Sequence, residues 1–107
     1  MNRTTCALSA PFLALLVSSQ AWGQSAGVVA VGEGDCRKSD RVVIATRRGF
    51  TLAEQYRGRF YKDYRVSGEL NRYGFKDVEV EGRDGRIYID DYQASEDRAK
   101  EWCFEED

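Results

Sequence analysis

Hydrophobic and polar positions alternate most regularly between Leu70 and Tyr92, with the period of two that marks a β-strand. Two such runs are separated by Asp84 and Gly85, a pair that tolerates the positive φ angles of a two-residue turn. The apolar residues of the two runs are Val78, Val80, Ile87 and Ile89. The pattern therefore predicts a β-hairpin that turns at Asp84–Gly85, with one apolar face and one largely acidic face.

Three more segments before this hairpin have a recognisable pattern. The run Arg41–Thr46 is rich in β-branched residues and predicts a strand. Thr51 and Glu54 have the spacing of a capping box, and apolar residues follow at intervals of four, which predicts a helix to about Tyr64. From Tyr64 to Tyr73 the pattern fits either a continued helix or a strand, and both interpretations stay open.

A last helix is expected after Ser95, whose hydroxyl can accept a hydrogen bond from a backbone N–H of the first turn. The order strand, helix, strand, strand, helix predicts an α+β fold. In this fold a small antiparallel sheet, built on the hairpin, packs with helices in a single domain. The alternative is an all-β meander.

The N-terminal residues have the features of a secretory signal peptide. Arg3 precedes the apolar run Ala7–Val17, and Ala21 and Gly23 are small residues with the spacing of a cleavage site. We expect cleavage after Gly23, with cleavage after Gly27 as the alternative. The expected location is a bacterial periplasm or the outside of the cell.

The chain is thus expected to divide into three regions: the signal peptide at residues 1–23, an arm at residues 24–35 and a domain at residues 36–107. The arm consists largely of Gly, Ala and Val without a clear period, so we expect it to be flexible. An edge strand formed by the run Val28–Val31 is the alternative.

Two cysteines remain after removal of the signal peptide, because Cys6 lies within it. A pair of cysteines in an exported protein indicates a disulfide, here between Cys36 and Cys103. It would close a loop of about 67 residues and contribute on the order of 4 kcal/mol in the chain-entropy model. The chain contains no His, and two distant cysteines are too few for a zinc site, so no metal and no cofactor are expected.

Charge is distributed unevenly along a chain whose net charge is −2. Residues 37–72 carry ten Lys and Arg against four acids, whereas residues 73–107 carry five against twelve. The two halves can neutralise each other, or the basic half can form a face for an anionic polymer or membrane surface. The residues of this possible anionic-ligand face are Arg47, Arg48, Arg57, Arg59 and Arg65. Nucleic acid is not an expected partner of an exported, acidic chain.

Residues 70–80 (LNRYGFKDVEV) and 83–90 (RDGRIYID) together resemble PepSY-type domains of exported bacterial proteins. Those domains run helix, Gly-aromatic, strand, Asp-Gly turn and strand, and their Asp-x-x-x-Gly ending is absent here. The resemblance implies a non-catalytic periplasmic module that binds or restrains partner proteins.

Catalysis finds little support in the sequence, which has no His for general-base chemistry and no G-x-S-x-G motif. We therefore expect a small exported protein, not an enzyme, that binds a protein or peptide partner in the bacterial envelope. The alternative is a protein that binds an anionic polymer or a membrane surface through its arginine-rich and aromatic face.

Overall fold

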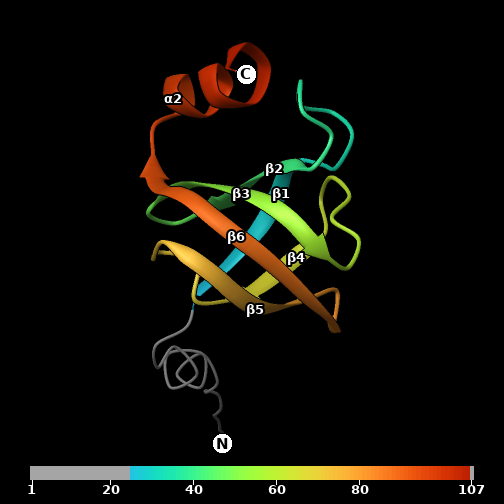
Figure 1. The fold of residues 1–107 in the computed structure, drawn as a ribbon. Coiled ribbons are helices and arrows are strands. Elements are labelled where there is room, and N and C mark those ends of the chain that lie inside the picture. The colour runs from blue at the N-terminus through green and yellow to red at the C-terminus, as the bar shows by residue number, and fades with distance from the viewer. Residues whose placement is uncertain (1–24, 107) are drawn as a thin grey trace, which may run out of the picture.

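The computed structural model describes residues 25–106, which form a closed antiparallel β-barrel followed by a short helical segment (Figure 1). The strands are β1 (Ser25–Val31), β2 (Arg41–Thr46), β3 (Gly49–Arg57), β4 (Arg65–Gly68), β5 (Gly74–Val80) and β6 (Arg83–Ala94). Their order around the barrel is β1-β2-β3-β6-β5-β4, and β4 pairs with β1 to close it. The helical segment consists of α2 (Glu96–Lys100) and the π-helical turn η2 (Glu101–Glu105). The expected signal peptide and its cleavage site after Gly23 lie outside the described residues.

The predicted α+β fold is wrong, because the segment expected to be a helix from Thr51 forms β3 and the loop after it. Residues four apart lie on the same side of a strand as well as of a helix, so the spacing of Leu52 and Tyr56 fits both. The hydroxyl of Thr51 does not cap a helix. It is fully buried and donates a hydrogen bond to the carbonyl oxygen of Leu70 at 2.8 Å. The alternative of an all-β meander agrees better with the structure, although the strands close into a barrel.

The expected flexible arm is also wrong from Ser25 onward, because residues 25–31 form β1. This strand pairs on both sides: Val28 lies opposite Ala45 of β2 and opposite Arg65 of β4. The segment is therefore part of the barrel wall, and it is not the edge strand of the alternative interpretation. The open segment between Tyr64 and Tyr73 contains β4, so its strand interpretation is confirmed.

The predicted hairpin is present as β5 and β6, but its turn lies at Glu81 and Gly82. Both residues have positive φ, 51° and 78°, as a tight two-residue hairpin loop requires. Gly85 lies within β6 opposite Val78. A Cβ on Gly85 would lie 3.2 Å from the ring of Phe60, so this glycine allows close packing inside the barrel. The glycine of the Asp84–Gly85 pair is thus required for packing inside the barrel and not for a turn.

The barrel interior is the main hydrophobic core. The four apolar residues of the hairpin all point into it, as predicted. Phe60, from the loop between β3 and β4, is fully buried there. The fully enclosed members of this core include Val29, Val42, Ile44, Ala53, Phe60, Leu70, Ile87 and Ile89.

A second, smaller core lies outside the barrel wall, where the C-terminal helical segment covers β2 and β3 (Figure 1). Val43 and Leu52, which lie opposite each other on these strands, pack there with Trp102. The run Arg41–Thr46 is therefore buried on both faces, which explains why it is almost continuously apolar. We call the outer surface at Val43 and Leu52 the helix-covered face.

Two features attach the helical segment to the barrel. The predicted disulfide between Cys36 and Cys103 is confirmed, with an S–S distance of 2.05 Å. The side chain of Arg41, which is 7% exposed, donates from Nη1 to the carbonyl oxygens of Trp102 and Glu106 at 2.6 and 2.8 Å. The predicted cap is also confirmed, since Ser95 Oγ accepts from the N–H of Arg98 at 3.1 Å.

Candidate functional site

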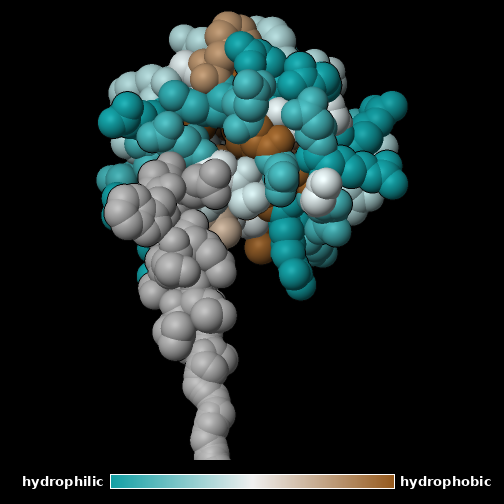
Figure 2. All heavy atoms as spheres, turned by 90° about the horizontal axis from the view of Figure 1, so that it is seen from below, coloured by the Kyte–Doolittle hydropathy of each residue, from teal (hydrophilic) through white to brown (hydrophobic). Residues whose placement is uncertain are grey.

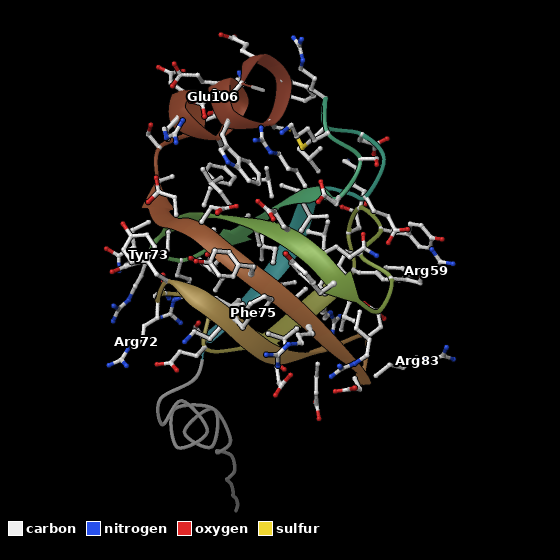
Figure 3. All side chains as sticks on the ribbon, in the orientation of Figure 1. Arg59, Arg72, Tyr73, Phe75, Arg83 and Glu106 are labelled. Atoms are coloured by element: carbon white, nitrogen blue, oxygen red, sulfur yellow. A yellow bond between two sulfur atoms is a disulfide. The ribbon has the colours of Figure 1, made fainter. Side chains whose placement is uncertain are left out.

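Three aromatic side chains form a connected group on the outer surface of β3, β5 and β6. Tyr56 and Phe75 have ring centroids 4.9 Å apart, and Phe75 and Tyr88 are also 4.9 Å apart, both pairs edge to face. Tyr56 is 57% exposed and Phe75 is 47% exposed. Figure 3 labels Phe75 on β5. We call the surface formed by Tyr56, Phe75 and Tyr88 the aromatic face.

Strand register brings these three rings together. Phe75 of β5 lies directly opposite Tyr88 of β6, and Tyr88 lies opposite Glu54 of β3. Tyr56 is two residues after Glu54 and so points to the same side of β3. Rings on neighbouring strands at such positions are within contact distance. The three strands therefore place one aromatic side chain each on a shared outer surface.

A second pair of rings lies near the start of β5. Tyr73 and Tyr92 have centroids 4.8 Å apart, and Tyr73 is 61% exposed. Figure 3 labels Tyr73 close to the start of this strand. Tyr92 also packs against the core of the barrel. The exposed aromatic surface thus continues from Phe75 along β5 towards Tyr73.

Arginines border the aromatic face on one side, and acids already pair with them. The guanidinium of Arg86 lies over the ring of Phe75 at 4.8 Å and donates from Nη1 to Asp77 at 2.6 Å. Arg57 donates from Nε to Asp84 at 2.8 Å, and this hydrogen bond raises the pKa of Arg57. Positive charge on this border is therefore largely neutralised within the protein.

Two carboxyl groups, Glu54 and Asp90, border the aromatic face on its other side. Glu54 lies opposite Tyr88, and Asp90, at the irregularity of β6 between Ile89 and Asp91, lies next to the carboxyl group of Glu54. Burial, and then Asp90, raise the pKa of Glu54 to about 7. Asp90 Oδ2 is buried and has no hydrogen-bond partner among residues 25–106. A proton held by Glu54 and donated to Asp90 would account for both observations.

The five arginines of the predicted anionic-ligand face do not form one surface. Arg47 and Arg48 lie in the turn before β3, whereas Arg57 ends that strand, so the two positions are roughly 30 Å apart along it. Arg59 pairs with Glu33 at 3.1 Å. Arg65 begins β4. No observation tests whether any of these arginines binds an anion, so that assignment stays a prediction.

Two of these arginines, Arg47 and Arg65, line a groove of about 650 Å³ on the outer surface of β1 and β4. Neither forms an ion pair with another residue in the described range. Its lining also includes small residues, among them Ala26 and Ala45, and the acids Glu79 and Glu81. From below, hydrophobic patches are visible between hydrophilic side chains (Figure 2). The groove is thus mixed in charge, which the prediction from the arginines alone did not include.

The aromatic face was missed in the sequence. Tyr56 lies in the segment for which the sequence predicts a helix, whereas the structure places it on β3. Phe60, from the same segment, is fully buried. The alternation in the hairpin could have identified part of this face, because Phe75 and Tyr88 occupy outward positions next to acidic residues.

Neither a metal site nor a membrane span is found in the part of the chain that the structure describes. Residues 25–106 contain no group of three or more His, Cys, Asp and Glu side chains that could hold a metal ion. Within the same residues, no helix is long and apolar enough to cross a membrane. Comparisons with protein-family models, with curated proteins and with solved structures found no match to this chain.

Proposed function

We propose that this protein is a small, exported, non-catalytic binding module that docks a protein or peptide partner on its aromatic face. The observation that carries the proposal is the exposure of Tyr56 and Phe75 on a barrel whose helix-covered face is buried beneath the C-terminal segment. The barrel has its own closed core and does not need these rings inside it.

The composition of the aromatic face is that of a protein-binding surface. Tyr, Phe and Arg are enriched in the cores of protein interfaces, where a few buried rings carry much of the binding energy. Aromatic side chains have few rotatable bonds, so ordering them on binding costs little entropy. Here the rings hold one another edge to face, and Arg86 lies over Phe75. The surface is therefore ordered before a partner arrives.

Export is supported by the disulfide and by the pattern of the N-terminal residues. Disulfides persist in oxidising compartments such as the periplasm and the cell exterior. The Cys36–Cys103 bond is compatible with such a location.

The proposal is tested by retention of a partner from an envelope extract on the immobilised mature protein and on two variants. Phe75→Ser removes the central ring of the aromatic face. Phe104→Ser is the matched control, because Phe104 is 50% exposed but lies on η2. A partner retained by the wild type and by Phe104→Ser but lost from Phe75→Ser supports the proposal. Equal retention by all three contradicts it.

Binding of an anionic polymer or surface remains the second candidate, because Arg47 and Arg65 line one groove without an ion pair to another described residue. This function predicts retention on heparin that falls as salt concentration rises. The variant Arg47→Gln with Arg65→Gln should then lose retention, while Phe75→Ser should keep it. The two functions are therefore separable with the same set of proteins.

A further inference from the structure

The aromatic face has an acidic side that its own arginines do not reach. Arg57 and Arg86 pair with Asp77 and Asp84 on the opposite border. Glu54 and Asp90 form no ion pair within 4 Å with any of residues 25–106. Their carboxyl groups adjoin Tyr88 through strand register, Glu54 across from it and Asp90 along the same strand.

We propose that the partner docked on the aromatic face presents a lysine or arginine side chain, which packs against Tyr88 and Tyr56 and pairs with Glu54 and Asp90. This inference rests on the proposed function and names the chemistry of the partner. The partner is thus a protein or peptide segment that combines a basic side chain with apolar ones.

Charge complementarity selects this occupant over an acidic or neutral one. An acidic side chain at this position would be repelled by the two carboxyl groups once Glu54 is ionised. A lysine ammonium or an arginine guanidinium brings several donors and one positive charge. Hydrogen bonds between ionised groups are the strongest that a partner can form at such a surface.

The rings beside the carboxyl groups also suit a cation. Cations are attracted to the faces of aromatic rings at distances up to about 6 Å. Such contacts occur within residues 25–106, with Arg86 over Phe75 at 4.8 Å and Arg41 over Trp102 at 4.6 Å. Tyr56, at 57% exposure, retains surface for a cation from a partner.

Arg41, the basic side chain that acts on Glu54, is directed elsewhere. Arg41 lies opposite Glu54 in the register of β2 and β3. Its Nη1 atom donates to the carbonyl oxygens of Trp102 and Glu106, so this group holds the C-terminal segment. The charged groups that act on Glu54 are Asp90 on β6, Arg41 on β2 and Asp40 just before β2. The two acids outnumber the one cation.

Binding of a basic side chain should therefore depend on pH. Below neutral pH Glu54 holds a proton, and one carboxylate charge is absent from the surface. As pH rises through about 7, Glu54 ionises, and a bound cation would favour the ionised form. The affinity for a basic partner should accordingly increase across this range, whereas the affinity for a neutral partner should stay constant.

The test uses three synthetic peptides of equal length that contain leucine and glycine with either Lys, Gln or Glu at the same positions. Binding to the mature protein is followed by NMR through the ring signals of Tyr56, Phe75 and Tyr88 at millimolar peptide. We expect the Lys peptide to shift these signals and to bind about tenfold more tightly than the Gln peptide. The variants Glu54→Gln and Asp90→Asn should each remove most of that difference and its dependence on pH.

Two results would overturn the inference. One is equal binding of the Lys and Gln peptides at the rings, which would leave the proposed docking function in place with a neutral partner. The other is an absence of shifts at the rings with the Lys peptide. Retention of a partner from extract on Phe75→Ser tests the proposed function separately, so the two failures are distinguishable. Folding of each variant is checked by its amide spectrum.

Discussion

The helix-covered face and the aromatic face share strand β3 and differ in what lies over them. On β3, Leu52 and Tyr56 are four residues apart and point to the same side. Leu52 is fully buried beneath the C-terminal helical segment, whereas Tyr56 is 57% exposed. The helix-covered face is thus a second core, and the aromatic face is a surface. The two faces therefore differ in role because the C-terminal helical segment covers one of them and not the other.

The C-terminal helical segment, which is the cover of the helix-covered face, is held by particular contacts. Cys103 of η2 is bonded to Cys36 in the loop before β2, and Arg41 binds two carbonyl oxygens near the end of the chain. A helical segment as short as Glu96–Glu105 is not stable alone in water. Packing of Trp102, the disulfide and Arg41 therefore act together to keep Val43 and Leu52 out of water. No comparable segment covers the aromatic face among the described residues.

The largest expected effect comes from removing the cover. Cys103→Ser, or reduction of the wild-type disulfide, should lower the free energy of unfolding by about 2–5 kcal/mol. The helical segment should detach and expose Leu52 and Val43, which turns the helix-covered face into a second exposed surface. Urea unfolding with and without reductant measures the change. Unchanged stability on reduction, with two reactive thiols in the folded protein, would refute this account of the cover.

A pair of truncations should separate the two faces. Leu52→Ala removes a fully buried side chain and should cost about 2–5 kcal/mol. Phe75→Ala removes a half-exposed ring with edge-to-face neighbours and should cost about 1 kcal/mol. Thermal or urea unfolding of both variants measures the two losses in the free energy of unfolding. Similar costs at the two positions would mean that the aromatic face is a structural element like the helix-covered face.

The sequence predicted part of the fold for physical reasons that can be named. Alternation assigned the inward residues of β5 and β6 correctly, because burial on one side of a strand enforces a period of two. The disulfide followed from two cysteines in a chain that the sequence predicts to be exported. β3 was misassigned because a spacing of four is common to helices and strands. The hairpin turn was misplaced because Gly85 serves close packing against Phe60.

The candidate site was less predictable than the fold. Whether an outward apolar residue is covered depends on where the C-terminal segment folds back, and this is set by contacts between residues far apart in the chain. Arg41 and Trp102, for example, are 61 positions apart. The predicted arginine set failed as a single surface because β3 separates Arg47 from Arg57. Alternation alone could identify Phe75 and Tyr88 as outward, but it could not show that no other segment packs over them.

The smallest expected effect on stability concerns pH at the border of the aromatic face. The pKa of Glu54 rises from 4.5 to about 7 on folding, so the folded state binds more protons than the unfolded state between these values. The free energy of unfolding should therefore decrease as pH rises through this window. The variant Glu54→Gln should show a flatter dependence. Melting temperatures of both proteins across the window check this, and identical profiles would contradict the shift.

The central claim, that the aromatic face is where a partner docks, is tested most directly by site-specific photo-crosslinking in the native envelope. A benzophenone amino acid replaces Tyr56 in one protein and Phe104 in another, since both side chains are exposed to a similar degree, 57% and 50%. We predict a covalent adduct of one defined mass from position 56 and none from position 104. An adduct from position 104 alone, or none from position 56, would contradict the account.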